Sequence, residues 1–169
     1  MQSQLQSVEN LPRGIRPRKF VFVLLPKFTL LSFTSALECL RISNRMANQV
    51  LYSWELVSEN GAPITCSAEI EFSIDHDLEE LNRDDTIMVC GGENIRAATT
   101  KRLLSWLRRE SRRGLAIAGL CTGAFPMAKA GLLEGKRATI HWENQDSLAE
   151  EFESVELTKS GFIIEGNSM

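Results

Sequence analysis

The chain has 169 residues, of which 43% are hydrophobic and 24% charged, and its formal net charge is −3. These values are typical of one globular domain and exclude a wholly disordered chain. The slightly acidic balance gives no global reason to expect binding to nucleic acid or to an anionic membrane. No apolar run approaches the ~20 residues that span a bilayer, and the N-terminus lacks a secretory signal pattern, so we expect a cytoplasmic protein.

The four cysteines are too widely spaced for a C-x-x-C pair, so they predict neither a zinc site nor a disulfide framework. They are Cys39, Cys66, Cys90 and Cys121. The two histidines, His76 and His141, are too few for a His-rich metal site. We therefore expect no metal and no cofactor, and four free thiols in a reducing compartment.

In chain order, residues 1–19 are polar, with two prolines and a basic end, which predicts a disordered leader. From residue 20 onward, short apolar runs alternate with helical patterns. Strands are predicted at residues 20–25, 52–57, 86–90, 115–118, 137–140, 155–158 and 162–164, with two short extended pieces within 64–74. Helices are predicted at 30–46, 96–113, 122–130 and 143–152, the second ending at Gly114. This alternation indicates one α/β domain with a parallel sheet covered on both faces.

The segment LAIAGLCTGAF at 115–125 is the most informative stretch. A buried strand runs into GLCTG and then into a helix, which is the G-x-S-x-G nucleophile-elbow pattern with Cys121 in place of serine. We expect Cys121 to project at the carboxyl edge of the sheet, where α/β folds bind ligands and where a helix N-terminus favours a thiolate. A small residue packed in a tight turn is the competing interpretation, and the pentapeptide alone does not separate the two.

Two further features fall at the same predicted edge. Gly91 and Gly92 follow a buried strand, so a backbone N–H there could form an oxyanion hole with the Cys121 turn, although a plain turn also needs glycine. His141 ends the strand RATIH and could reach Cys121, although a single histidine is more often structural.

Charge is segregated along the chain. Residues 96–113 hold seven basic residues against one acid, and residues 69–85 hold eight acids against one base. The basic helix is either a solvated helix face or a DNA-contacting surface, and we favour the first because no groove-reading pattern accompanies the charges. Pairing of acidic and basic surfaces between subunits is a third possibility.

Longer stretches identify a family. VCGG at 89–92, GLCTGAFPMAKAGLLEGKRATIHWE at 119–143 and LLPKFTLLSFTSALECLRISNR at 24–45 resemble the class I glutamine-amidotransferase-like domain of AraC-type transcription regulators. That domain is a branch of the PfpI-like superfamily, which also holds proteases, deglycase-like proteins and isocyanide hydratases. Over residues 20–169 the resemblance implies a flavodoxin-like three-layer sandwich with a nucleophile elbow, and it implies homodimers.

Carried over by position, the resemblance implies that Cys121 is the elbow residue and that His141 is the histidine found near it. The Gly92 and Cys121–Thr122 backbone would then lie at the oxyanion site. The ligand-binding residues that it implies are Gly91, Gly92, Cys121, Thr122, Ser32 and His141.

Two departures from the enzymes of the group bear on function. The enzymes place Asp or Glu at the start of the first helix, beside the cysteine, and the resemblance puts Ser32 at that position in this chain. The nearest acid, Glu38, should point away from the cysteine. Thr122 stands where the proteases carry a histidine. A general acid/base is commonly worth ~10²–10⁴ in rate, so its loss favours sensing over turnover.

We therefore expect a small-molecule-sensing regulatory domain whose effector is, by the resemblance, an amino acid or a quaternary amine such as a betaine or carnitine. The alternative is a cysteine-dependent hydrolase or hydratase that uses Cys121, and a redox sensor is a lesser one. Regulators of this branch continue past the EGN motif into two helix-turn-helix units, whereas this chain stops at Met169. DNA binding would need that missing domain, so we expect either a fragment of a longer regulator or a truncated product.

Overall fold

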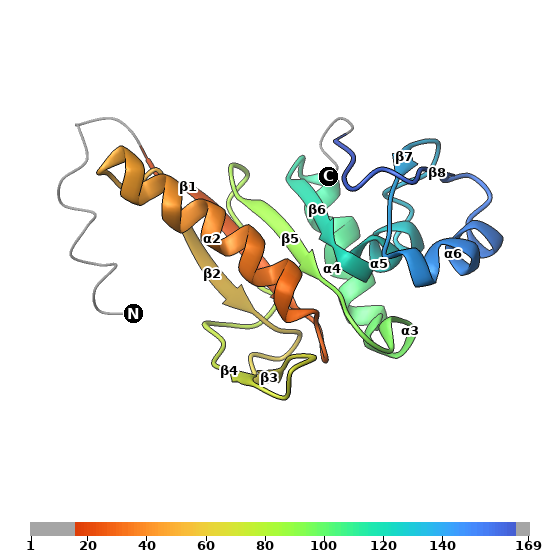
Figure 1. Cartoon of the computed structure of the whole chain (residues 1–169), viewed down its shortest axis with the longest axis horizontal. Helices are drawn as coiled ribbons and strands as arrows, with labels where there is room; N and C mark the ends of the chain where they lie inside the picture. Colours follow the sequence, from red (N-terminus) through yellow and green to blue (C-terminus); the bar gives the residue numbers. More distant parts are fainter. Residues whose placement is uncertain (1–15, 165–169) are drawn as a thin grey trace.

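The computed structural model describes residues 16–164 and shows a three-layer α/β/α sandwich (Figure 1). Its central sheet has four parallel strands in the order β2-β1-β5-β6. They are β1 (Arg18–Leu24), β2 (Tyr52–Val57), β5 (Thr86–Cys90) and β6 (Ala116–Leu120). Two short pairs lie outside this sheet: β3 (Ile64–Thr65) with β4 (Glu71–Phe72), and β7 (Arg137–Ala138) with β8 (Glu156–Leu157). The central strands follow the flavodoxin-like order 2-1-3-4, which confirms the predicted fold class.

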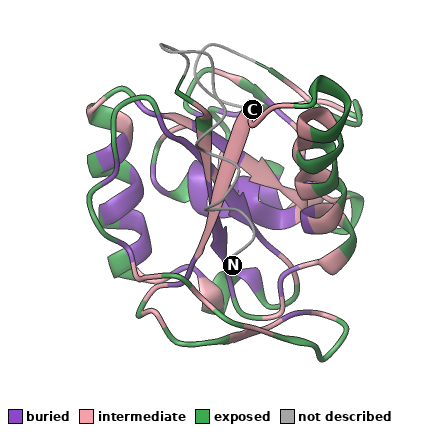
Figure 2. Cartoon of the chain, turned by 90° about the vertical axis from the view of Figure 1, so that its left-hand side faces the viewer, coloured by how far each residue is buried: buried purple, intermediate pink, exposed green. Residues whose placement is uncertain are grey.

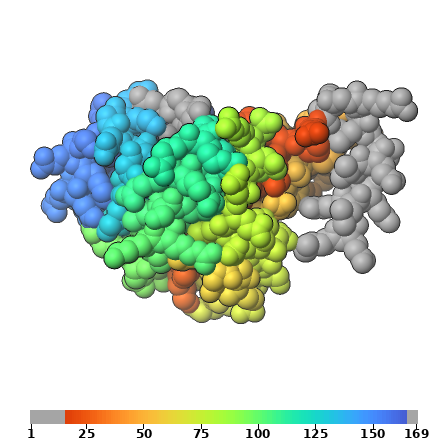
Figure 3. Space-filling model, turned by 180° about the vertical axis from the view of Figure 1, so that it is seen from behind, coloured from red at the N-terminus to blue at the C-terminus, as the bar shows by residue number. Residues whose placement is uncertain are grey.

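Helices cover both faces of the sheet, as buried parallel strands require. One face carries α2 (Leu30–Ala47), and the other carries α3 (Ile95–Ala98), α4 (Lys101–Arg112) and α5 (Ala124–Lys129). Seen from behind, α4 covers the middle of the molecule (Figure 3). The helix α6 (Gln145–Glu151) lies beside β8. Within residues 16–164, no helix is long and apolar enough to cross a membrane.

The two helical layers bury very different amounts of side chain (Figure 2). α4 has five buried residues among twelve, whereas α2 has one, Phe33, among eighteen. Phe33 packs edge-to-face on Phe22 of β1, with ring centroids 5.3 Å apart. The remaining inward side chains of α2 are half-buried, so this layer is held mainly by one aromatic cluster.

Several bounds differ from the sequence prediction by a few residues, and the start of β1 and the helix predicted at 96–113 differ in ways that have a clear cause. β1 begins at Arg18, because Arg18 and Lys19 continue the register against β2; residues 1–15 of the predicted leader lie outside the described residues. The prediction of a single helix at 96–113 is wrong, because the helix is interrupted at Thr99–Thr100 and forms α3 and α4. The Thr100 hydroxyl accepts the Leu103 N–H and so caps the start of α4.

The strand predicted at residues 162–164 is also wrong. These residues have no β partner among the residues described, and Phe162 is 75% exposed and Ile164 62% exposed. Without a neighbouring strand, the apolar run has nothing to pair with.

The basic and acidic segments form ion pairs within the same domain. Arg102 of α4 binds Asp77 in the acidic loop at 2.6 Å, and the fully buried Glu110 binds both Arg109 and Arg113. Five of the seven basic residues in 96–113 contact acids or carbonyl groups of the same chain. This pairing favours the interpretation of the basic helix as a structural surface over a DNA-contacting one.

His76 joins the loop before β5 to the sheet. Its Nδ1 lies 2.8 Å from the Asp77 carbonyl oxygen, and its Nε2 lies 3.1 Å from Glu55 Oε2. Both ring nitrogens therefore face acceptors, which only the imidazolium form can satisfy. Partial burial lowers the pKa of His76, but the hydrogen bonds to Glu55 and to the Asp77 carbonyl outweigh it and raise the pKa above the ordinary 6.5.

We predict that His76 stabilises the fold at low pH. Because its folded pKa is raised, its contribution is fully present below pH 6.5 and is lost as the pH rises through the folded pKa. Thermal unfolding across pH should show His76→Gln below wild type in acid, with the gap closing in alkali. A gap that stayed constant or widened with pH would contradict the charged assignment.

Candidate functional site

Cys121 lies at a strained turn between β6 and α5. Its φ is +57°, a left-handed conformation that non-glycine residues rarely adopt. A single 3₁₀ turn, η2 (Cys121–Gly123), joins the strand to the helix. The elbow expected from GLCTG is therefore present, and the Cys121 side chain is half-buried at the carboxyl edge of the sheet.

Two glycines allow the backbone segments around the elbow to touch. A Cβ at Gly123 would overlap the Val89 carbonyl oxygen of β5. A Cβ at Gly92 would overlap the Lys27 carbonyl oxygen in the loop that leads into α2. The elbow and both neighbouring loops are thus packed backbone against backbone, which only glycine permits at these points.

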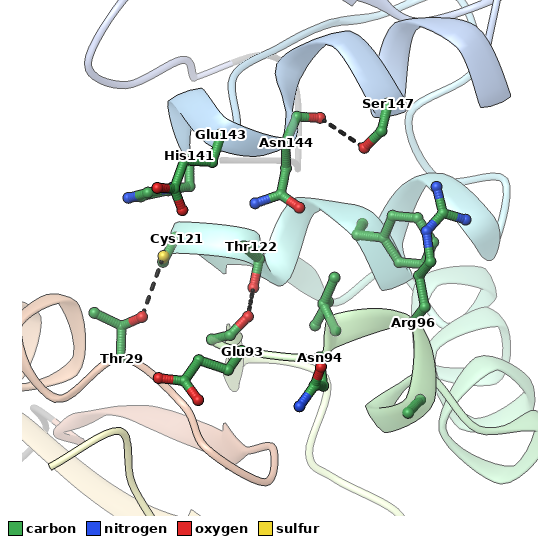
Figure 4. A pocket seen from close by; sticks show the side chains of 14 residues that line it. Thr29, Glu93, Asn94, Arg96, Cys121, Thr122, His141, Glu143, Asn144 and Ser147 are labelled. Carbon is green, nitrogen blue, oxygen red and sulfur yellow. Dashed lines mark hydrogen bonds and ion pairs between the residues drawn. The ribbon is translucent and has the colours of Figure 1, made fainter.

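A cavity of about 610 Å³ opens at this edge (Figure 4). Four of the residues that the sequence singled out line it: Gly92, Cys121, Thr122 and His141. The sequence analysis did not anticipate others, among them Thr29, Glu93, Asn94, Arg96, Asn144 and Ser147. These come from the β1–α2 and β5–α3 loops, from α3 and from the segment that begins α6.

The Cys121 thiol is paired with a hydroxyl. Thr29 Oγ1 donates to Cys121 Sγ at 3.3 Å, drawn as a dashed line in Figure 4. Ser32, the position expected beside the thiol, instead donates to the Thr29 carbonyl oxygen at 3.0 Å. Glu38 pairs with Arg41 on the exposed face of α2 and so points away from the sulfur. Within residues 16–164, no carboxylate hydrogen-bonds to the sulfur.

The sequence marks the place of Thr29 before a helix, but not its contact with Cys121. Thr29 directly precedes the apolar helical pattern that starts at Leu30, the N-cap position that threonine favours. Thr29 is the N-cap residue of α2, but its hydroxyl makes no capping hydrogen bond. The side chain is thereby available to the thiol.

Neither His141 nor Gly91 has the role at the thiol that the sequence suggested. The recorded ionic neighbour of His141 is Glu143, 3.8 Å away, and among the described residues no hydrogen bond joins His141 to Cys121. Gly91 is buried, and its N–H donates to the Leu120 carbonyl oxygen at 3.2 Å. The Gly91 amide is therefore occupied by the backbone of β6 rather than directed at the cavity.

Thr122 fixes the loop opposite the elbow. Its hydroxyl donates to the Gly92 carbonyl oxygen at 2.8 Å, and its side chain is buried. Thr122 thus ties η2 to the loop after β5.

The cavity has an acidic end and a basic end. Glu93 and Glu143 lie on the Cys121 side, whereas Arg96 lies on the far side (Figure 4). Arg96 pairs with Glu151, and its guanidinium carbon stands 5.0 Å from the centre of the Phe125 ring. The amide side chains of Asn94 and Asn144 lie between the two ends. Such a cavity can accept a small polar molecule that carries both signs of charge.

A second cavity, of about 600 Å³, meets the first at Cys121 and His141. It contains Ser32 together with apolar residues of β6 and of the segment near residue 162. Cys121 therefore stands between a polar and a more apolar space. No group of His, Cys, Asp or Glu in the described chain is arranged to hold a metal ion.

The remaining cysteines have other surroundings. Cys66 and Cys90 are buried, and burial raises the pKa of the Cys90 thiol far above its ordinary value. Cys39 is exposed on α2. Cys121 alone among the four lines the cavities at the sheet edge.

Comparison with known families decides the identity of this fold. The DJ-1/PfpI family matches residues 18–167. The chain belongs to the DJ-1/PfpI family.

Two relatives of this DJ-1/PfpI domain are transcriptional regulators from Pseudomonas aeruginosa. The HTH-type transcriptional regulator CdhR is 39% identical over 147 residues, which cover 87% of this chain and 44% of the relative. The HTH-type transcriptional regulator GbdR is 32% identical over 156 residues, which cover 92% of this chain and 42% of the relative. The chain therefore spans less than half the length of either.

A solved AraC family transcriptional regulator from Pseudomonas putida superposes with a TM-score of 0.76 at 26% identity. The match covers 90% of this chain and 82% of that one. The resemblance to regulators of the AraC type, expected from the sequence, is confirmed.

We predict that Gly92→Ala destabilises the DJ-1/PfpI domain by about 2–4 kcal/mol, because its Cβ has no space beside the Lys27 carbonyl. Urea denaturation measures the loss. Gly161→Ala is the matched control, since a Cβ there meets no atom within 4 Å. Equal stability of the two variants would contradict the close approach.

We predict that Thr29→Val slows alkylation of Cys121 by iodoacetamide several-fold, about three- to tenfold, because the donating hydroxyl stabilises negative charge on sulfur. The rate is measured in a Cys39→Ser background, which removes the exposed thiol. Thr29→Ser retains the hydroxyl and should keep the wild-type rate. Unchanged alkylation in Thr29→Val would show that the contact does not affect the thiol.

Proposed function

We propose that this chain is the small-molecule-sensing domain of an AraC-type transcription regulator, and that the effector binds in the cavity beside Cys121. The observation that carries the proposal is the hydroxyl of Thr29 on the sulfur, where a catalytic site would need a group that can exchange protons. The regulator relatives support the same conclusion.

The effector that fits the cavity is an amino acid or a quaternary amine with a carboxylate. Its cationic group would lie between Glu93 and Glu143, and its carboxylate would lie toward Arg96. The amides of Asn94 and Asn144 can donate to the carboxylate or accept from an ammonium group. Gly92, Thr122 and His141 complete the wall around Cys121.

Regulation would follow from the place of the cavity in the fold. It joins the loops after β1 and β5 to the segment before α6, which are otherwise separate parts of the chain. A bound effector would hold these segments together and thereby shift the arrangement of a homodimer. DNA binding would belong to a helix-turn-helix domain of the full regulator, and the domain would act in the cytoplasm.

The test is a thermal-shift screen of the chain with glycine betaine, carnitine and the common amino acids. We expect one compound to raise Tm in a concentration-dependent way, because a ligand that binds the native state stabilises it. Glu93→Gln and Arg96→Gln should each weaken the response about tenfold in ligand concentration. Glu150→Gln, which lies outside the cavity, is the matched control.

Cys121→Ser separates sensing from covalent chemistry. A sensor keeps its thermal shift in this variant, since the effector is held by the polar walls of the cavity. Loss of the shift in Cys121→Ser, or equal responses from Glu93→Gln and wild type, would contradict the proposal.

The second candidate is a cysteine-dependent hydrolase or hydratase. The left-handed φ of Cys121 supports it, because strained elbows of this kind hold nucleophiles. An isocyanide or reactive carbonyl compound consumed by the wild type, and not by Cys121→Ala with an intact fold, would establish this activity instead. Selective modification of Cys121 by mild peroxide would favour a redox sensor.

A further inference from the structure

The second cavity beside Cys121 has an apolar floor formed by one face of the sheet. Met88 of β5 and Ala118 of β6 are paired in register, and Leu120 follows Ala118 on the same side of β6. Met88 and Leu120 are only half-buried, because α2 lies further along the sheet, where its Phe33 packs on β1. The sheet face over β5 and β6 is therefore open to the cavity.

The walls and the rim of the second cavity are also apolar. Leu133 and Ile140 are buried beside it. Trp142, Phe162 and Ile164 line it as well, although they are 72%, 75% and 62% exposed. Large apolar side chains gathered around an apolar cavity mark a place where another apolar group binds.

Charge distinguishes the two cavities. The first contains Glu93 and Glu143 on its Cys121 side. Among the described residues that line the second, none is acidic, and the charged ones are Arg137 and Lys159. A cationic group is therefore favoured in the first cavity, whereas the second favours a neutral, apolar part of a ligand.

The two cavities share Cys121 and His141 as a common wall. In Figure 4 these two side chains lie at one end of the first cavity and Arg96 lies at the other. A zwitterion whose carboxylate lies toward Arg96 thus has its cationic end beside the second cavity. A chain attached to the cationic nitrogen is then the part that extends past the thiol.

We propose that the effector is a zwitterion with an aliphatic chain on its cationic nitrogen, the charged head lying in the first cavity and the chain in the second. This inference rests on the proposed sensing function and narrows the chemical class of its effector. The chain lies over Met88 and Leu120 and covers the exposed rim formed by Trp142, Phe162 and Ile164. Burial of each methylene group there raises the affinity by roughly two- to fourfold.

The test compares glycine betaine with N-hexyl-N,N-dimethylglycine, in which a hexyl group replaces one N-methyl group. Isothermal titration calorimetry of the chain measures both dissociation constants. We expect the hexyl compound to bind at least about thirtyfold more tightly, because the change adds five methylene groups. Glycine and N-hexylglycine form the corresponding pair for an amino-acid head.

Two variants test where the chain lies. Met88→Gln puts a polar amide of similar length on the floor of the second cavity, so the ratio of the two dissociation constants should fall about tenfold. Phe162→Ser, at an exposed position of the rim, should lower the same ratio about threefold. Met46→Gln is the matched control and should keep the wild-type ratio, since Met46 is 80% exposed on α2 and lies outside both cavities.

The outcomes separate this inference from the sensing function. A head that binds without any gain from its chain would overturn the inference alone and assign the second cavity to a protein segment. A gain that neither Met88→Gln nor Phe162→Ser reduces would place the chain elsewhere and also overturn it. Absence of binding by both pairs would overturn the inference together with the proposed effector class.

Discussion

The functional edge of this domain depends on contact between backbones. Three segments meet at Cys121: the elbow after β6, the end of β5, and the loop between β1 and α2. Gly123 lies against the Val89 carbonyl and Gly92 against the Lys27 carbonyl, so a single methyl group at either position would separate them. That crowding holds Cys121 in a left-handed conformation and fixes the direction of its sulfur.

Once the sulfur is fixed, its chemistry is set by what the β1–α2 loop presents. A carboxylate there can take and return protons, which catalysis by a thiol needs. A threonine hydroxyl stabilises the sulfur but exchanges no proton near neutral pH. The cavity around it keeps the polar groups of a binding site, with Glu93 and Arg96 at opposite ends. The turn that holds the thiol and the polar cavity beside it are thus both present, without a carboxylate hydrogen-bonded to the sulfur among residues 16–164.

The two helical layers differ in how much side chain they bury against the sheet. α4 buries five side chains, and its Arg102 and Arg109 pair with Asp77 and Glu110 of the same chain. α2 buries Phe33 and leaves Leu31 and Met46 exposed on its outer side. Thr29, the residue that directly precedes α2, donates its hydroxyl to the Cys121 thiol.

The sequence by itself determined the central strands, the elbow and the family, because these depend on neighbouring residues: the runs at 52–57 and 86–90 are strands at those bounds, and GLCTG forms the turn it predicts. Tertiary structure decided what no local pattern contains. Thr29 and Cys121 are 92 residues apart, and only the parallel sheet brings their loops to one edge. Likewise the apolar run at 162–164 has strand character but no adjacent strand, since pairing is a property of the partner as much as of the segment.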